Sequence, residues 1–391
     1  MRWWWTGPAG DAATALPVPS SSGRAEPAAR PGPRRPTILH VVESLGSGVT
    51  TAVEDYLQST PDYRHVVLGW RRRGAQTGDQ LDRLAAELLA LPAGRLAQLR
   101  AVHRRVEELR PEIVHAHSSW AGLYVRLLPR RLGSALVYTP HGFSFERRDV
   151  PAPARGAFWL AEAALSLRGA CVAAVGPREA ELARRLPGRQ LVTHVPNVIR
   201  LVEPEPPPAA AGARVPSVLC LATVGRITPA KDPAFFRRLV LLGREQGLPL
   251  RWIWVGGGDP AEERALRDAG VLVTGWSSRA RALGWLATAD VYVHTAAWEG
   301  APVSVLEAAA LGLPIMARRN RALAALGMPS LCDTPEALIE VARSLLDERQ
   351  RAALRAQSER LLRQHRPEAQ REALARVYAA ALRAGSLSGP R

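Results

Sequence analysis

The stretch "TILHVVESLGSGVTTAVEDYLQ", residues 37–58, joins three kinds of local pattern in immediate succession. Its first part, 37–45, is rich in β-branched and apolar residues and is typical of a buried strand. The glycines of Gly46-Ser47-Gly48 then allow a tight turn, and an amphipathic helical pattern follows at once. A strand, a glycine turn and a helix are the opening of a βαβ unit. The sequence therefore predicts an α/β fold built on a parallel sheet.

Further strand patterns recur along the whole chain. The strands expected after the first are 64–70, 112–117, 135–142, 170–176, 191–197, 217–225, 250–258, 271–276, 290–296 and 313–318. Helical stretches such as 95–111 separate several of them. Near-continuous apolar strands that alternate with helices predict parallel sheets covered on both faces.

A Pro/Ala-rich segment without periodicity, 203–216, interrupts this alternation. We interpret it as part of a linker, 201–216, between an N-terminal domain, 36–200, and a C-terminal domain, 217–391. The helical end of the chain is expected to pack along the second domain and to cross back to the first. The prediction is two doubly wound Rossmann-like domains facing a cleft, with ligands at the carboxyl ends of both sheets.

The composition, 47% hydrophobic and 23% charged residues over 391 positions, is that of a globular protein. Its three scattered cysteines fit neither a disulfide framework nor a zinc site, which favours the cytoplasm. No apolar run reaches the ~18 residues of a spanning helix. Residues 1–35 are expected to be a disordered leader, whose Trp3–Trp5 cluster offers a weak contact with a membrane interface. Association with the inner face of the cell membrane is the accompanying expectation.

The net charge of +16 raises nucleic acid or an anionic membrane as partners. No zinc-finger, RNP or basic-zipper signature accompanies the charge, so we expect no nucleic-acid partner. Short runs of arginine such as Arg147-Arg148 occur in the first half of the chain. The simplest interpretation of each run is a solvated surface, and the functional alternative is a peripheral contact with anionic lipid or with a phosphorylated acceptor. Of the 52 basic side chains, Lys231 is the single lysine.

The stretch "WEGAPVSVLEAAALGLP", 298–314, contains a predicted helix with two informative ends. Pro302 suits the first helical position, and the helix is expected to run to Leu311. The free N–H groups of Val303 and Ser304 would then point into the cleft. Such a helix N-terminus binds anions and suits a diphosphate.

Two glutamates frame this helix start. Glu307, one turn into the helix, could accept hydrogen bonds from a vicinal diol such as a ribose, and Glu299, just before it, could do so from a sugar hydroxyl. The alternative is that acids in a first turn merely complement the helix dipole.

Several motifs occur together with this E-x7-E pair: "ILHVVESLGSGV" (38–49), "EIVHAHSSWAG" (112–122), "TPHGF" (139–143), "VGRITPAKDP" (224–233), and "WVGGG" (254–258) followed by "VTGW" (273–276). In this order they resemble the family 4 glycosyltransferases, which have the GT-B fold. The resemblance spans roughly 37–380. It implies transfer of a sugar from a nucleotide diphosphate, most often a UDP-sugar, to a glycan or lipid-linked acceptor, with retention of configuration.

The resemblance also implies roles for matching residues. On the donor side, Arg226 and Lys231 correspond to the basic pair at the diphosphate, Glu307 to the acid at the ribose and Glu299 to the acid beside the donor sugar. The remaining donor-binding positions expected are Gly300, Val303, Ser304, Gly275 and Trp276.

In the first domain, Gly46 and Gly48 correspond to the glycine loop at the phosphate or acceptor. His117 corresponds to the histidine that reaches into the cleft near the reacting carbon, with a satisfied histidine at a strand end as the alternative. The roles of His115 and His141 are less clear from the resemblance. The histidines expected to be structural are His40, His194 and His294.

Some chemistries are not expected. Gly256-Gly257-Gly258 lacks the G-x-G-x-x-G spacing and a ribose acid, which argues against NAD. No Asp-x-Asp pair occurs, so we expect no metal and no other cofactor, the nucleotide-sugar being a substrate. The run after Pro314 also lacks the Gly-x-x-Glu element common in the family. A UDP-sugar epimerase of GT-B fold and a non-catalytic basic membrane- or nucleic-acid-binding protein remain as alternatives.

Overall fold

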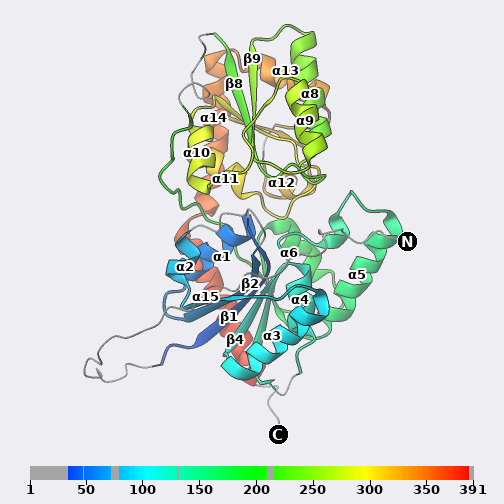
Figure 1. Cartoon of the computed structure of the whole chain (residues 1–391), viewed down its shortest axis with the longest axis vertical. Helices are drawn as coiled ribbons and strands as arrows, with labels where there is room; N and C mark the ends of the chain where they lie inside the picture. Colours follow the sequence, from blue (N-terminus) through cyan, green and yellow to red (C-terminus); the bar gives the residue numbers. More distant parts are fainter. Residues whose placement is uncertain are drawn as a thin grey trace, which may run out of the picture. The chain divides into compact units, whose positions relative to one another are not determined.

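Apolar runs and amphipathic helices alternate along the chain and form two parallel β-sheets in the computed structural model (Figure 1). The structure describes residues 34–46, 48–71, 79–129, 132–208, 215, 217–328 and 330–386. The predicted leader, 1–35, lies outside the described residues apart from its last two, and so does the Trp3–Trp5 cluster.

The first sheet has seven strands in the order β3-β2-β1-β4-β5-β6-β7. Its strands are β1 (Thr37–Leu45), β2 (Arg64–Arg71), β3 (Glu87–Ala90), β4 (Ile113–His117), β5 (Ala135–Thr139), β6 (Cys171–Ala174) and β7 (Val192–His194). The second sheet has six strands in the order β10-β9-β8-β11-β12-β13. These are β8 (Leu219–Val224), β9 (Leu250–Val255), β10 (Leu272–Val273), β11 (Val291–His294), β12 (Ile315–Arg318) and β13 (Leu331–Cys332).

Helices connect most successive strands within each sheet, and α13, α14, η3 and α15 follow the last strand. In the first half of the chain they are α1 (Gly48–Ser59), α2 (Asp79–Leu84), α3 (Arg95–Leu109), α4 (Ser119–Arg126), the 3₁₀ turn η2 (Ser144–Glu146), α5 (Ala152–Ser166) and α6 (Pro177–Arg184). In the second half they are α8 (Pro233–Glu245), α9 (Pro260–Asp268), α10 (Arg279–Ala287), α11 (Val303–Ala310), α12 (Arg321–Ala325), α13 (Pro335–Ser344), α14 (Glu348–Leu361), the 3₁₀ turn η3 (Leu362–Gln364) and α15 (Pro367–Ser386).

Both sheets reverse their strand order at a central strand. The reversal falls between β1 and β4 in the first sheet and between β8 and β11 in the second. Ligands of doubly wound sheets bind beyond the carboxyl ends of the strands at such switch points, because the two flanking loops diverge there. The loops that follow these four strands are therefore where a site is expected, and they carry most of the residues singled out above.

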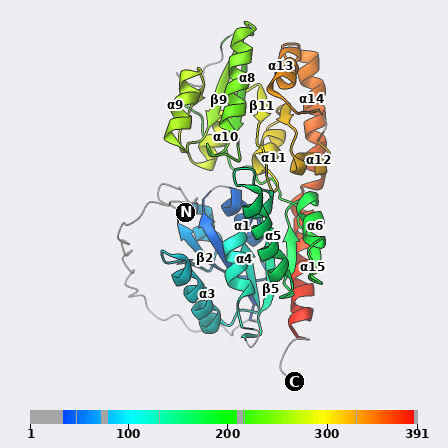
Figure 2. The same cartoon turned by 90° about the vertical axis from the view of Figure 1, so that its right-hand side faces the viewer.

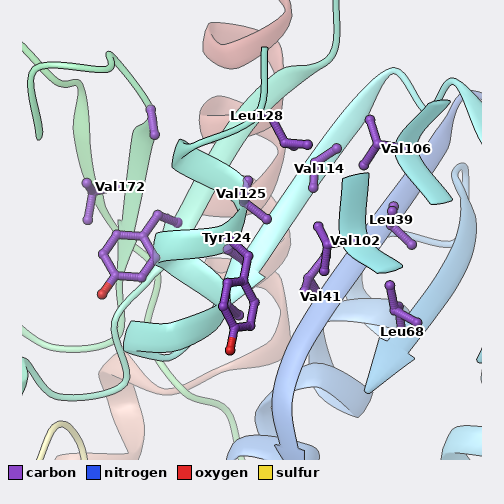
Figure 3. Packing of buried hydrophobic residues seen from close by; sticks show 14 of the residues in the cluster. Leu39, Val41, Leu68, Val102, Val106, Val114, Tyr124, Val125, Leu128 and Val172 are labelled. Atoms are coloured by element: carbon purple, nitrogen blue, oxygen red, sulfur yellow. The ribbon is translucent and has the colours of Figure 1, made fainter. Parts of the chain in front are cut away.

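The core of the first domain lies between its sheet and the helices α3 and α4. Figure 3 shows Val102 and Val106 of α3 and Val125 of α4 directed toward Leu39 and Val114 of the sheet, all of them at most 1% exposed. Each such side chain contributes about 1.5–3 kcal/mol by leaving water. This packing fixes the strand ends from which the site loops emerge.

The last helix, α15, packs on the other face of the first sheet (Figure 2). Leu374, Val377 and Tyr378 of α15 are fully buried against a cluster that includes Ile38 and Val137. The domain range 217–391 included this helix, but its apolar stripe is covered by the first domain, in agreement with the expectation that the helical end crosses back to it. Among the described helices, none is both long and apolar enough to span a membrane.

Candidate active site

The loop after β8 carries Arg226 and Lys231, and glycines let it pack closely. Gly225 has a φ of +152°, and a Cβ there would lie 2.8 Å from Cε of Lys231, so the lysine stem crosses directly over this glycine. A Cβ at Gly256, in the loop after β9, would lie 2.2 Å from the carbonyl oxygen of Gly225. The β8 loop is thus held between the lysine stem and the backbone of its neighbour.

Lys231 forms an ion pair with Glu299, which lies in the segment between β11 and α11. The hydroxyl of Thr295 donates to the Lys231 carbonyl at 2.9 Å and so ties the two segments together. Nε2 of His294 lies 3.8 Å from Oε1 of Glu299. Burial, and after it the charge of Lys231, hold the pKa of His294 well below its ordinary value, so this ring is neutral. One cation and one anion therefore neutralise each other here.

Helix α11 begins at Val303, one residue later than we expected. Pro302 is its N-cap, because a ψ of 106° leaves that residue extended. No side chain caps the helix, so its first N–H groups, which include those of Val303 and Ser304, receive no side-chain acceptor. The Ser304 hydroxyl accepts a hydrogen bond from Tyr292 at 2.8 Å. The helix ends at Ala310 rather than at Leu311.

Glu307 belongs to a cluster of charges that the sequence did not predict. Its Oε1 accepts a hydrogen bond from Nε of Arg279 at 2.8 Å. Asp55 of α1, only 2% exposed, lies 3.5 Å from Nε of Arg200 and also feels the charge of Arg279. Oδ2 of Asp55 and Nη2 of Arg279 are buried and have no hydrogen-bond partner among the described residues. Such unsatisfied groups are suited to a polar ligand.

The cluster makes a testable contribution to stability. Burial raises the pKa of Asp55 to about 7, and its arginine neighbours offset this only in part. The native state then binds a proton more tightly than the unfolded chain, so stability from this group is present at low pH and is lost as the pH rises through about 7. Between pH 5.5 and 8 the wild type should lose roughly 2 kcal/mol that Asp55→Asn does not lose.

Thermal unfolding of both proteins at the two pH values measures this difference. Glu54 and Glu179, whose pKa values burial also raises, are present in both proteins and cancel. Parallel changes in melting temperature would contradict the assignment to Asp55.

Residues 300–301 lie against loops of the first domain. A Cβ at Gly300 would lie 2.8 Å from the backbone N of Gly142, and one at Gly176 would lie 3.4 Å from the Gly300 carbonyl oxygen. Nδ2 of Asn197 donates to the Ala301 carbonyl at 3.1 Å. Backbone approaches this close need glycine, which accounts for the small residues of both "TPHGF" and "WEGAP". Glu299 and Gly300 thus lie against the loop that follows β5.

A row of four histidines crosses one face of the first sheet and ends at this contact. Nδ1 of His65 lies 3.1 Å from Nε2 of His40, Nδ1 of His40 lies 3.1 Å from Nε2 of His117, and Nδ1 of His117 lies 3.1 Å from Nε2 of His141. His141 is the least buried of the four and has a positive φ of 54°. A strained backbone of this kind is typical of functional sites.

One carbonyl group sets the tautomer of the whole row. Burial lowers the pKa of all four rings, that of His141 to about 3, so each is neutral and has one N–H. Nε2 of His65 lies 2.8 Å from the Thr60 carbonyl, which can only accept, so this nitrogen donates. Nδ1 of His65 must then accept from His40, and the same rule passes along the row. His141 is left with an unprotonated Nδ1.

A second grouping shares two of these rings. Ring nitrogens of His40, His115 and His117 lie within 4.8 Å of one another, a spacing that a metal ion could bridge. His40 and His117 are already hydrogen-bonded within the row, and His115 bonds to Tyr378 at 3.0 Å and to Thr139 at 2.8 Å. Binding a metal would break these bonds, so the geometry favours the hydrogen-bonded arrangement.

His117 was expected to reach toward the reacting carbon. The structure buries it completely, with both ring nitrogens bonded to other histidines. The ring at the site end of the row is His141, so an effect of His117 on a substrate runs through His141.

The other expected residues are more dispersed. Gly46 has a φ of 139° and donates from its N–H to the Thr50 hydroxyl at 2.6 Å, and a Cβ at Gly48 would lie 4.0 Å from Cγ2 of Val303. Gly275 has a φ of 73° and open space around it, and Trp276 is 56% exposed beside the β9 glycines. Gly275 and Trp276 follow the edge strand β10, whereas Lys231 and Glu299 follow the central strands β8 and β11.

The comparisons with known proteins agree with this architecture. Residues 47–198 match the family described as glycosyl transferase 4-like domain, and residues 219–348 match the glycosyl transferases group 1. The chain thus consists of two glycosyltransferase-type domains and belongs to the GT-B glycosyltransferase superfamily.

The individual proteins that the chain resembles share little sequence identity with it. The Escherichia coli UDP-Gal:alpha-D-GlcNAc-diphosphoundecaprenol alpha-1,3-galactosyltransferase is 27% identical over 236 residues, which are 56% of this chain and 60% of that protein. The matched region thus spans less than two thirds of the relative. Anabaena HepE in complex with UDP and glucose has a TM-score of 0.69 at 16% identity, covering 88% of this chain and all of that one. Sucrose-phosphate synthase from Thermosynechococcus elongatus has a TM-score of 0.72 at 16% identity, with 90% and 100% covered. These structures confirm the predicted GT-B fold.

Proposed function

We propose that this protein transfers a sugar from a UDP-sugar to a glycan or lipid-linked acceptor, with retention of configuration and without a metal ion. The observation that carries the proposal is the Lys231–Glu299 pair before the uncapped start of α11, at the switch point of the second sheet. The relative that acts on a diphosphoundecaprenol acceptor supports the donor and acceptor classes.

The ion pair suggests how donor binding is coupled to chemistry. A diphosphate placed at the N-terminus of α11 offers Lys231 a stronger anionic partner than one carboxylate. The exchange frees Glu299 to accept hydrogen bonds from the donor sugar. When the nucleotide departs, negative charge develops on its β-phosphate, and Lys231 with the helix N–H groups stabilises it.

Glu307 is placed for a different part of the donor. It lies one turn into α11, beside the unsatisfied donor group of Arg279. We infer that the carboxylate binds the ribose diol and that Arg279 holds it in place. No carboxylate is assigned as a nucleophile on the sugar, so attack on the same face, assisted by the leaving phosphate, accounts for retention.

The test is a transfer assay with a panel of UDP-, GDP- and ADP-sugars and a GlcNAc-diphosphate acceptor carrying a short alkyl chain. We expect a UDP-sugar to be used and NMR of the product to show a retained anomeric configuration. Interconversion of a UDP-sugar in the absence of acceptor would instead indicate an epimerase. An inverted product would contradict the proposed mechanism.

Metal independence gives a separate prediction. Because a lysine and a helix start meet the phosphate charge, transfer should persist within twofold in excess EDTA. The assay is repeated with Mg²⁺, Mn²⁺ or Zn²⁺ added back. Activity that is lost in chelator and restored by one of these ions would show that a cation takes part.

A further inference from the structure

Helix α5 exposes apolar residues and buries polar ones, which is the reverse of the usual amphipathic helix. Every residue of this helix that is exposed is apolar, namely Ala152, Pro153, Gly156, Ala157, Trp159, Leu160, Ala161 and Ala164. Of its three buried residues, Glu162 and Ser166 are polar. A helix on a soluble protein normally buries its apolar stripe and exposes its charges, so this arrangement calls for an apolar partner outside the protein.

The polar face of α5 is fixed to the first domain by a buried ion pair. Nη1 of Arg126, 1% exposed, donates to Oε2 of Glu162 at 2.9 Å. The Tyr138 hydroxyl donates to Oε1 of the same carboxylate at 3.1 Å, and the guanidinium stacks over the Tyr138 ring at 4.1 Å. These bonds prevent the helix from rotating to bury its apolar side. The outward direction of that side is therefore set by the fold.

Four large side chains define what we call the α5 patch: Trp159 (43% exposed), Leu160 (64%), Leu167 (63%) and Leu127 (45%). Leu127 comes from the end of α4, and it is brought beside α5 because Arg168 donates to the carbonyls of Arg126 and Leu128, both at 3.0 Å. The turns after α4 and α5, which carry Leu127 and Leu167, are thus bonded to each other.

Arginines border the patch at both ends of α5. Arg147 and Arg148 precede the helix, Arg155 lies in its first turns and Arg168 follows it. The acids in the same stretch are Asp149, which pairs with Arg147, and Glu162, which Arg126 neutralises in the interior. The border therefore carries a net positive charge around an apolar centre that contains a tryptophan.

We propose that the α5 patch docks on the interface of an anionic lipid bilayer. Tryptophan and leucine enter the boundary between head groups and acyl chains, while flanking arginines attract anionic lipid. This inference rests on the proposed function in one respect, that an enzyme acting on a lipid-linked acceptor must work at a membrane surface. The η2 turn and a short loop connect the docked helix to His141 at the site.

A second copy of the chain is the less suitable occupant. A stable protein interface involves about 20–30 residues on each side, whereas α5 presents eight exposed residues, most of them small. A bilayer interface needs only a few inserted side chains, because lipids adapt to the shape of the surface.

The experiment is flotation of the full-length protein with vesicles of phosphatidylcholine alone or with phosphatidylglycerol added. The α5 variant is Trp159→Ser/Leu160→Ser/Leu167→Ser. The matched control is Leu96→Ser/Leu191→Ser/Leu241→Ser, which removes three exposed leucines elsewhere, 58%, 50% and 37% exposed. All six side chains are solvent-exposed, and circular dichroism confirms that both variants are folded.

We expect wild type and control to float with the anionic vesicles and the α5 variant to bind at least tenfold more weakly. Flotation of the α5 variant equal to that of the wild type would overturn the proposal. A wild type that does not bind vesicles but forms a dimer, which the α5 variant does not form, would also overturn it. Transfer to the short-chain acceptor should be the same in all three proteins. Because flotation needs no turnover, a wild type that transfers sugar but does not float contradicts only this inference, and a wild type that floats but does not transfer contradicts only the proposed function.

Discussion

Lys231→Ala should lower kcat about 100- to 1,000-fold, the loss that follows removal of one preorganised group at a developing oxyanion. The structure adds a second reason, since the variant also leaves Glu299 without its cation. Steady-state rates at saturating UDP-sugar measure the effect. Arg238→Ala is the control, because that arginine lies 47% exposed on α8 and should keep a rate within twofold of wild type.

Lys231→Arg tests whether charge alone suffices. The lysine stem lies so close over Gly225 that an added Cβ there would be 2.8 Å from Cε, so a longer, planar guanidinium cannot follow the same course. We expect at least a tenfold loss of turnover, about 1.4 kcal/mol. A rate within twofold of wild type would show that the shape of the cation does not matter.

Glu307→Ala should weaken UDP binding about 10- to 150-fold, since hydrogen bonds to a charged group contribute roughly 1.5–3 kcal/mol. The ribose is bound alike before and during the reaction, so turnover at saturating donor should change much less. Calorimetric titration with UDP measures the loss. Glu299→Ala is the contrasting variant, expected to lower kcat while leaving UDP affinity nearly intact.

Variants of Arg279 distinguish a direct from an indirect role of Glu307 in UDP binding. If the glutamate binds ribose, Arg279→Ala should weaken UDP less than Glu307→Ala does. If the glutamate serves only to neutralise Arg279, the double variant should recover the affinity that the single one loses. UDP bound as tightly by Glu307→Ala as by wild type would refute the ribose assignment.

Much of the fold could be predicted because the local patterns agree with the tertiary structure. The run 37–45 became β1 with the expected bounds, and the GT-B fold is confirmed. Strand β3, "ELLA" at 87–90, was missed because leucine, alanine and glutamate favour helix, and only pairing with β2 makes this segment extended. The strand expected over 135–142 ends at Thr139, where Pro140 lacks an N–H and His141 turns to positive φ.

Individual site residues could be predicted where they belong to a sequence motif. Contacts between side chains from distant segments could not. The pairing of Lys231 with Glu299 joins positions 68 apart, and no local pattern reports it. The adjacent acids Glu54 and Asp55, the only charged residues of α1, were an available signal for a buried charge cluster. Their arginine partners, Arg200 and Arg279, could be known only from the fold.

The row of histidines has a consequence for the electric field at the site. Every N–H in it points toward Thr60 and every lone pair toward His141, so the four ring dipoles add head to tail, as peptide dipoles do in a helix. The negative end of this sum lies at His141, where it favours positive charge developing on a sugar carbon and repels phosphate oxygens. A carbonyl cannot take up the last proton, so the row cannot conduct protons away from the site. Under the proposed function, this fixed field favours positive charge that develops on the sugar carbon beside the first domain and leaves the diphosphate to the second.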